Sequence, residues 1–265
     1  MMAQKILILT TVKDAHRFLD SYFLGIHQLS YPHELISLGL LEGDSTDGTF
    51  EALEARLPQL QKEFAAVGLW KKDFAFQIPE GTPRWASHIQ LQRRSILAKS
   101  RNHLLFRALD EEDWVLWLDV DVIKYPADII ERLLATGKEI IHPNCVREYG
   151  GKSFDLNAWR DQGKLHLHDL KGEGDLVPLH AVGGTMLLIK ADVHREGLIF
   201  PTFLYGKRNP LIRPSNKMVG ITSIKRRSRQ EHYGEVETEG LGMMAYDMGY
   251  ECWGMPNLEI KHTEE

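Results

Sequence analysis

Two aspartates stand directly after an unbroken apolar stretch of the sequence. Residues 114–118 read WVLWL, and Asp119 and Asp121 follow with one valine between them. An unbroken apolar run of this kind indicates a strand buried on both faces, as in a parallel sheet covered by helices. Residues i and i+2 of an extended segment point the same way, so both carboxylates are predicted to project from the carboxyl end of a central strand.

Two carboxylates held this close repel each other, and one stays protonated unless a cation lies between them. Mg²⁺ and Mn²⁺ prefer carboxylate oxygens and commonly share them with substrate phosphates. The carboxyl edge of an open α/β sheet is also where such folds bind ligands. Asp119 and Asp121 are therefore predicted to anchor a divalent metal and a diphosphate. The alternative is an ordinary strand end in which an Asp caps the next helix.

The elements that must position these aspartates alternate between strands and helices, which indicates β-α-β winding. This order predicts an α/β fold with a Rossmann-like, mostly parallel central sheet flanked by helices. Residues 1–265 are expected to form one domain, with a nucleotide-binding half at about 1–125 and an acceptor-binding half at about 126–265. The predicted strands are residues 5–10, 34–41, 69–77, 114–122, 139–142, 182–189 and 257–261. The predicted helices are residues 16–29, 49–64 with a bend near Pro58, 87–109, 126–136 and 241–248.

The ends of the first two strands carry groups that suit a nucleotide. Thr10 and Thr11 end the first strand with hydroxyls and amides, and the loop EGDSTDGT (residues 42–49) follows the second strand. Its small residues let the backbone approach a ligand, and Glu42 and Asp44 can accept from a ribose or a base. The alternative is an ordinary turn in which Asp47 caps the next helix.

Three further stretches are candidates for contact with a nucleotide diphosphate. Arg101 lies on the long helix before the apolar strand, from where a guanidinium can bind a diphosphate bidentately, although most basic residues on helices are merely solvated. Gly183 and Gly184 open a predicted strand, as expected where backbone approaches a ligand or another strand closely. Residues 207–229 contain eight Lys and Arg and no acidic residue, which indicates a segment that faces an anion or is simply exposed.

The C-terminal part supplies the remaining candidates. Glu237 and Glu239 precede a predicted helix, where their carboxylates either bind sugar hydroxyls or serve the helix dipole. His262 ends the last predicted strand and offers an imidazole that can complete a metal site, although a terminal His is more often a surface residue.

The overall composition excludes several classes. The chain is 43% hydrophobic and 26% charged with a net charge of −5, which argues against a general nucleic-acid binder. Its two cysteines, Cys145 and Cys252, offer no disulfide framework, and a reducing compartment is the simplest setting. Without a signal-peptide core or eighteen consecutive apolar residues, the chain is expected to have no transmembrane segment and to be cytoplasmic. No pattern fixes the number of subunits.

The sequence resembles nucleotide-sugar glycosyltransferases of the A-type fold. More narrowly, it is similar to the fungal Golgi α-mannosyltransferases that build the mannan backbone, the Anp/Van type of carbohydrate-enzyme family 62. The matching stretches follow one another over most of the chain: ILILT (6–10), YPH (31–33), SRN (100–102), WLDVD (117–121), HPNC (142–145), FDLNAW (154–159), VPLHAVGG (177–184), KADVHR (190–195) and ETEG (237–240).

This resemblance implies transfer of mannose from GDP-mannose to a hydroxyl of a sugar or small glycoside, with retention of anomeric configuration. It implies Mn²⁺ (or Mg²⁺) held by Asp119, Asp121 and His262, a catalytic role for Asp121, and acceptor contacts near Glu237 and Glu239. Metal bridging the two phosphates would stabilise the departing GDP. No residue's context marks it as a covalent nucleophile, so a front-face displacement is the preferred mechanism.

Some features depart from that family or fit others. The fungal relatives carry a membrane anchor ahead of the catalytic domain and none is visible here, so secretory mannan synthesis is not the expected setting. The loop at 42–49 also resembles that of family 2 glycosyltransferases, many of which use UDP-sugars. A haloacid-dehalogenase-type phosphatase usually places its D-x-D after the first strand, and a sugar nucleotidyltransferase has a Gly-rich basic loop there. A non-catalytic carbohydrate-binding partner protein is the alternative from a different class.

Overall fold

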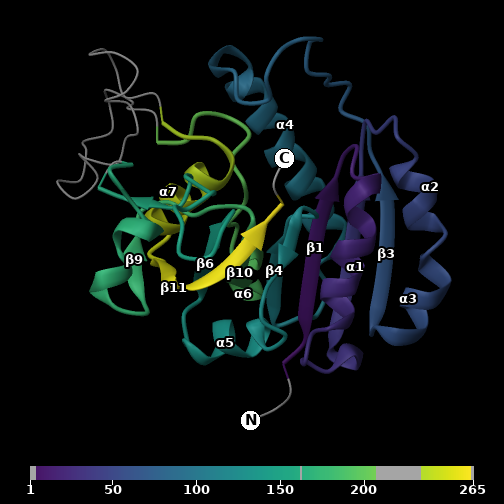
Figure 1. Cartoon of the computed structure of the whole chain (residues 1–265), viewed down its shortest axis with the longest axis horizontal. Helices are drawn as coiled ribbons and strands as arrows, with labels where there is room; N and C mark the ends of the chain where they lie inside the picture. The colour runs from purple at the N-terminus through teal and green to yellow at the C-terminus, as the bar shows by residue number, and fades with distance from the viewer. Residues whose placement is uncertain (1–3, 162, 207–233, 264–265) are drawn as a thin grey trace.

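The computed structural model describes residues 4–161, 163–206 and 234–263. Nine strands of this part form one sheet in the order β3-β2-β1-β4-β10-β6-β11-β5, with β9 also paired to β11 (Figure 1). The strands are β1 (Ile6–Val12), β2 (Ile36–Glu42), β3 (Ala66–Lys71), β4 (Trp114–Leu118), β5 (Val122–Lys124), β6 (Ile140–Val146), β9 (Val177–Leu179), β10 (Met186–Lys190) and β11 (Cys252–His262).

Six of these nine strands run in the same direction. Strands β3, β2, β1 and β4 pair in parallel, and so do β6 and β11. Strand β10 lies antiparallel between β4 and β6, which gives β6 the direction of β4, while β5 and β9 are antiparallel to β11. The predicted mostly parallel sheet is confirmed.

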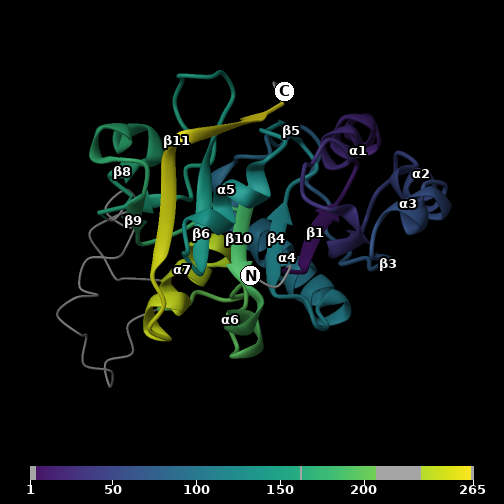
Figure 2. The ribbon, with the colours of Figure 1, turned by 90° about the horizontal axis from the view of Figure 1, so that it is seen from below.

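Helices cover both faces of the sheet, as Figure 2 shows with α1 above the strands and α4, α6 and α7 below them. Alternate residues of β1 enter the two cores: Ile6 and Ile8 pack on one face, and Leu7 and Leu9 on the other. The first face carries α1 (Leu19–His27), α2 (Thr49–Glu54), α3 (Leu57–Glu63) and α5 (Ile129–Ala135), and the second carries α4 (Ser87–Ala108), α6 (Ala191–Arg195) and α7 (Glu237–Asp247).

Strand β4 is the doubly buried central strand that its sequence predicts. Leu116 and Leu118 pack in one core, and Val115 and Trp117 pack in the other. The Trp117 ring meets Phe200 edge-on with centroids 4.9 Å apart. Truncating a buried Trp of this kind to Ala costs roughly 3–5 kcal/mol, so this strand anchors the site at its end.

The helix predicted after β2 is two helices. α2 ends at Glu54 and α3 begins at Leu57, with Pro58 in its first turn, where the missing N–H needs no partner. Asp47 accepts the N–H of Thr49, the first residue of α2, at 3.1 Å. The N-cap of α2 is Gly48, and no side chain caps the helix, so Asp47 bonds to the first residue of α2 from one position before the N-cap that the alternative interpretation assigned to it.

The strand predicted at residues 69–77 is shifted and shorter. β3 spans residues 66–71, because its pairing with β2 ends at the last residue of β2, Glu42. Beyond it, the N–H groups of Phe74 and Ala75 donate to the carboxylate of Asp44 instead of to a neighbouring strand. A side chain thus takes the backbone donors that would extend the ladder.

Boundaries also differ in the C-terminal part. β6 reaches Val146, and the segment after it contains the short β7 (Trp159–Arg160) and β8 (Leu165–His166), which form a separate two-stranded sheet. β10 starts at Met186, after the two glycines, and α7 starts at Glu237. β11 begins at Cys252 and shifts register between Met255 and Glu259, where Pro256 has no N–H to give.

Two sequence features meet the limits of the described part. The basic stretch at 207–229 lies outside the described residues. Of the helices that are described, none is both long enough and apolar enough to cross a bilayer.

Candidate active site

Residues 119–121 form the turn between β4 and β5. Because β5 pairs with β11 and not with β4, the chain crosses here from the middle of the sheet to its edge. The N–H of Asp119 donates to the carbonyl of Thr185 at 2.9 Å, and the N–H of Thr263 donates to the carbonyl of Asp121 at 3.0 Å. Thr185 precedes β10 and Thr263 follows β11, so the turn is tied to the ends of two further strands.

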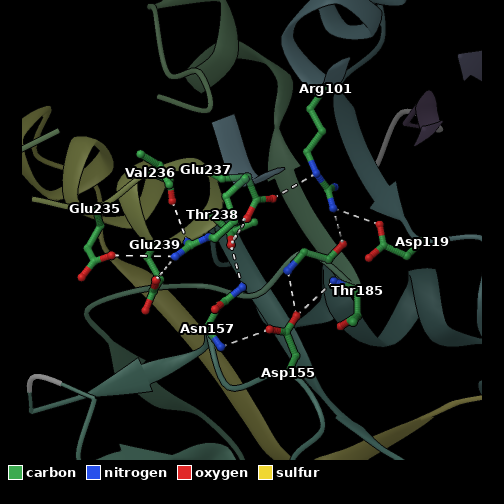
Figure 3. A network of polar contacts seen from close by, with 12 residues as sticks. Arg101, Asp119, Asp155, Asn157, Thr185, Glu235, Val236, Glu237, Thr238 and Glu239 are labelled. Carbon is green, nitrogen blue, oxygen red and sulfur yellow. Dashed lines mark hydrogen bonds and ion pairs between the residues drawn. The ribbon is translucent and has the colours of Figure 1, made fainter. Parts of the chain in front are cut away.

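Asp119 is paired with an arginine of α4. Its Oδ1 accepts from Nη2 of Arg101 at 2.9 Å, and 30% of its side chain is exposed (Figure 3). Burial raises the pKa of Asp119 from 3.8 to about 6, against the charge of Arg101 and with the added repulsion of Asp121. The predicted repulsion between the two carboxylates is therefore present, although the strand ends before them and each has its own basic partner.

Asp121 is paired with the histidine at the end of β11. The register of β5 and β11 sets His262 opposite Val122, and Nε2 of His262 lies 3.1 Å from Oδ1 of Asp121. Burial would raise the pKa of Asp121 and lower that of His262. The attraction between them outweighs burial in both, so the pKa of Asp121 lies below its usual range and that of His262 above it.

Two contacts fix the His262 ring. It stacks on Phe154 with centroids 3.8 Å apart and planes inclined by 26°, and Nδ1 lies 2.9 Å from the carbonyl oxygen of Thr263. A ring protonated on Nδ1 donates to that carbonyl and leaves Nε2 free to bind a metal, an arrangement typical of metal-ligating histidines.

The donor chemistry of this pair fits the predicted metal. A carboxylate oxygen from Asp121 and an imidazole nitrogen from His262 suit Mn²⁺, whereas Mg²⁺ favours oxygen alone. In the described part of the chain, no three His, Cys, Asp or Glu side chains are gathered as a ready metal cluster. Asp119, the third predicted ligand, is paired with Arg101, and its role as a metal ligand stays a prediction.

Arg101 continues from Asp119 into a set of buried ion pairs (Figure 3). Its Nε lies 3.2 Å from Oε1 of Glu237, and Nη1 of Arg94 donates to Oε2 of Glu239 at 2.7 Å. Burial would lower the pKa of each arginine, but the carboxylates around them raise it above its ordinary value, so both stay charged. We call this set the interior charge cluster: Arg94, Arg101, Glu235, Glu237 and Glu239.

Glu237 and Glu239, the predicted acceptor contacts, both belong to this cluster. Glu237 is 3% exposed and Glu239 7%, and Nε1–H of Trp159 donates to Oε1 of Glu239 at 2.5 Å. Glu237 has a φ of +57°, and its N–H donates to the carbonyl of Pro201 at 2.9 Å. That left-handed conformation costs a non-glycine residue about 1–2 kcal/mol, which the surrounding bonds must offset. A catalytic role for either glutamate stays a prediction.

Two of the predicted nucleotide-binding side chains bind neighbouring parts of the protein. Thr10 is buried, accepts from the Tyr22 hydroxyl at 2.6 Å and donates to the carbonyl of Leu118 at 2.7 Å. Glu42 is also buried and accepts the N–H of Ser45 at 2.8 Å. Both side chains therefore hold the ends of strands β1 and β2 in place.

Asp44 holds the loop beyond β3. Its two carboxylate oxygens accept the N–H groups of Phe74 and Ala75, each at 3.0 Å. Thr11 is partly buried near the end of β1. Nucleotide contact by these two residues, and by Thr10 and Glu42, stays a prediction.

The two glycines before β10 are required by side chains of the protein itself. A Cβ on Gly183 would lie 2.1 Å from Oδ2 of Asp155, and one on Gly184 would lie 2.6 Å from Nη2 of Arg101. The predicted close approach therefore exists, but two charged side chains make it. Contact of Gly183 or Gly184 with the donor stays a prediction.

Asp155 is a site residue that sequence reasoning did not single out. Its Oδ2 accepts the N–H groups of Gly184 at 2.8 Å and Thr185 at 3.2 Å, and its Oδ1 accepts the N–H of Asn157 at 3.1 Å. Burial would raise its pKa, but His142 and these N–H groups hold it far below the usual range. Its one sequence signal was its place in the FDLNAW stretch, since its partners are backbone groups that no residue pattern marks.

Comparison with known proteins shows the family of this chain. The sequence profile of the Anp1 family matches residues 2–171 and 164–204. The chain belongs to the Anp1 family. Among Anp1-type relatives, the mannan polymerase II complex anp1 subunit of Schizosaccharomyces pombe is 31% identical over 304 residues, which cover 99% of this chain and 64% of the relative. The mannan polymerase complex subunit MNN9 of Candida albicans is 28% identical, over 99% of this chain and 75% of the relative.

The fold of this Anp1-family chain also occurs in a solved structure. It aligns with a mannosyltransferase, PcManGT from Pyrobaculum calidifontis in complex with GDP-Man and Mn²⁺, with a TM-score of 0.59 and 13% identity. The alignment covers 99% of this chain and 58% of that one. At this identity the likeness concerns the fold, and it confirms the predicted A-type glycosyltransferase fold. The chain spans 64% of the S. pombe relative, so it represents part of that protein's length.

Proposed function

We propose that this chain is a metal-dependent retaining glycosyltransferase that moves mannose from GDP-mannose to a hydroxyl of a sugar or small glycoside. The observation that carries the proposal is the Asp121–His262 pair at the sheet edge. A carboxylate oxygen of Asp121 lies 3.1 Å from an imidazole nitrogen of His262, and the imidazole ring is held by stacking on Phe154. Membership of the Anp1 family supports it. The GDP-Man and Mn²⁺ named with the PcManGT structure support the choice of donor and metal.

In this proposal Asp121 and His262 hold Mn²⁺ or Mg²⁺, and Asp119 completes the set. The bound ion would supply positive charge that stabilises the departing diphosphate. The protein's part is to keep the donors in place, which Phe154 and the Thr263 carbonyl do for the His262 ring. Arg101 is 4% exposed and already paired, so the structure favours an effect through Asp119 over the predicted bidentate contact with the diphosphate.

Chemistry on the donor needs no covalent enzyme intermediate. In a front-face displacement the acceptor oxygen forms its bond to the anomeric carbon on the side from which GDP departs, so configuration is retained. The bond from that carbon to the phosphate oxygen breaks with its electron pair going to GDP, and the acceptor proton passes to a phosphate oxygen. The buried Glu237 and Glu239 then shape the acceptor side through the interior charge cluster.

Direct assay tests the proposal. We expect the chain to release GDP from GDP-mannose when Mn²⁺ and methyl α-mannoside are present, to form an α-linked product by NMR, and to stop when EDTA is added. Turnover that is unchanged in EDTA, or a β-linked product, would contradict the proposed mechanism.

The same assay distinguishes the proposed function from two alternatives. The loop at 42–49 resembles that of family 2 glycosyltransferases, many of which use UDP-sugars, and turnover of UDP-sugars in preference to GDP-mannose would change the proposed donor. The relatives are named as subunits of complexes, which keeps a non-catalytic carbohydrate-binding partner as the second candidate. Binding of a mannoside without turnover of any nucleotide sugar would favour that role. A cytoplasmic location stays a prediction.

A further inference from the structure

Two consecutive residues of the segment after β6 contact opposite sides of the site. Phe154 stacks on His262, and Asp155 accepts the N–H groups before β10. The N–H of Phe154 donates to the carbonyl of Cys145 at 2.7 Å, which ties the dipeptide to strand β6. One short piece of chain, anchored on the sheet, therefore contacts both the histidine side and the Asp119 side.

The Asp155 side acts through one peptide group. The Gly184–Thr185 peptide donates its N–H to Asp155 at 3.2 Å, and its carbonyl accepts from Nη2 of Arg101 at 3.3 Å. An anion at the N–H and a cation at the carbonyl polarise that peptide in the same direction, so each bond strengthens the other. The next carbonyl, of Thr185, accepts the N–H of Asp119. Asp155 thus fixes the backbone that holds Asp119 and its arginine (Figure 3).

The Phe154 side acts through ring packing. The His262 side chain is 4% exposed, and the face-to-face contact with Phe154 opposes rotation of the imidazole about its bond to Cβ. Without that contact the ring can turn and take Nε2 away from Asp121. The Thr263 carbonyl restrains Nδ1 but leaves the tilt of the ring free.

We propose that Phe154 and Asp155 are positioning residues of the metal and diphosphate site. Phe154 sets the plane of the His262 ring, Asp155 sets the backbone of Asp119, and the peptide bond between them fixes the two sides relative to each other. Neither side chain is required to touch the substrate. The inference rests on the proposed function, because it concerns how the same site is held.

Mn²⁺ binding in the presence of GDP tests the Phe154 arm without any need for turnover. Electron paramagnetic resonance measures free Mn²⁺ during titration of the protein. Phe154→Leu should lower the Mn²⁺ affinity about ten-fold, as loss of an outer-shell contact does, whereas Phe154→Tyr keeps the stacked ring and should stay within about two-fold of wild type. Phe106→Leu is the matched control, because that ring lies on α4 and is 70% exposed.

The Asp155 arm is tested by Asp155→Asn, which keeps the shape but loses the charge that polarises the Gly184–Thr185 peptide. We expect about a ten-fold loss of Mn²⁺ affinity and a fall in kcat that exceeds any rise in KM. Asp128→Asn is the control, because that side chain is exposed and pairs with Arg132 on α5. Circular dichroism checks the fold of each variant, and if Asp155→Asn does not fold, the Phe154 arm decides alone.

The possible results distinguish failure of the positioning role from failure of the proposed function. Wild-type affinity in folded Phe154→Leu overturns the positioning role while leaving the proposed function intact. A wild-type chain that binds no Mn²⁺ with GDP overturns the proposed function itself. Weakened binding in Phe154→Leu that Phe154→Tyr restores supports the inference, because general damage to the core would not be rescued by one ring.

Discussion

Asp119 and Asp121 are separated by one residue, yet the protein holds them in different ways. Asp119 binds Arg101, which is 5% exposed in its side chain and continues into the interior charge cluster between α4 and α7. Asp121 binds His262 at the edge of the sheet, where β5 and β11 meet. One carboxylate is tied to a partner that never loses its proton, and the other to a partner that can.

Because of this difference, the Asp119 side keeps a permanent ion pair, whereas the Asp121 side can exchange a proton for a metal ion. A metal ligand must give up its proton, and His262 can release one when a cation takes the place next to Asp121. Arg101 cannot, so the Asp119 side keeps its ion pair and its geometry. The Asp121 side is therefore expected to decide metal binding, and the Asp119 side to decide the stability of the site.

The largest expected effect is that of Asp121→Asn. It removes a charged donor next to His262, so we expect Mn²⁺ affinity to fall by more than roughly 100-fold and kcat by about a thousand-fold. Asp119→Asn should weaken Mn²⁺ affinity by only about ten-fold, because Arg101 already neutralises that carboxylate. Mn²⁺ titration and initial rates measure both, with Asp128→Asn as the control. Equal losses in the two variants would erase the proposed difference.

Glu237→Ala is expected to produce the next largest effect, on stability. It leaves the buried guanidinium of Arg101 with one carboxylate fewer, and removing one partner of a buried pair costs about 3–5 kcal/mol of unfolding free energy. Glu237→Gln keeps the shape and should lose less. Urea unfolding measures these changes, with the exposed Glu54→Ala as control. If Glu237→Ala spared stability but abolished Mn²⁺ binding, the glutamate would belong with the Asp121 side.

The pH dependence of metal-free stability should have opposite signs at the two aspartates. Folding raises the pKa of Asp119 from 3.8 to about 6, so the folded state binds its proton more tightly and stability falls as pH rises between these values, by up to about 3 kcal/mol. The pKa of Asp121 is lowered, so its contribution is present above its ordinary pKa and is lost as pH falls through the folded value.

Difference curves isolate these two contributions. Urea unfolding in EDTA from about pH 2 to 7 should show that Asp119→Asn removes a decline in stability between pH 3.8 and about 6, whereas Asp121→Asn removes a gain in stability that occurs below pH 3.8. Parallel curves for the two variants would mean that their surroundings do not differ as described.

The smallest effect should come from Gly184→Ala. The new Cβ would lie 2.6 Å from Nη2 of Arg101 and 3.1 Å from Cγ2 of Thr238, so one of them must move, at about 1–3 kcal/mol. Gly172→Ala is the matched control, because nothing lies within 4 Å of its Cβ, and it should change stability by less than about 0.5 kcal/mol. Thermal unfolding of both variants measures the difference. Equal stabilities would show that Arg101 is not pinned against this backbone.

The features of the fold that depend on local pattern could be predicted from the sequence. The apolar run before Asp119 predicts a doubly buried strand, and the alternation of strands and helices predicts a mostly parallel sheet. Boundaries were less accessible where side chains or proline interrupt a ladder. Asp44 takes backbone donors beyond β3, and Pro256 breaks the pairing of β11, and neither effect follows from hydrophobic spacing.

The sequence pointed to most residues of the candidate site, but it did not show which of these side chains pair with each other. Asp121 and His262 meet, as the family resemblance implies. Which cation neutralises Asp119 depends on how α4 packs against the sheet, so the sequence could not show that Arg101 is its buried partner. Asp155 could not be found because it binds backbone groups 29 and 30 positions later in the chain.

The most direct test of the central claim is calorimetry of GDP binding in Mn²⁺ and in EDTA, with wild type and His262→Ala. If the Asp121–His262 pair exchanges a proton for the metal that carries the nucleotide, wild type binds GDP only with Mn²⁺ and releases a proton as it does so, and His262→Ala does neither. Equal GDP affinity in EDTA, or wild-type behaviour of His262→Ala, would contradict it.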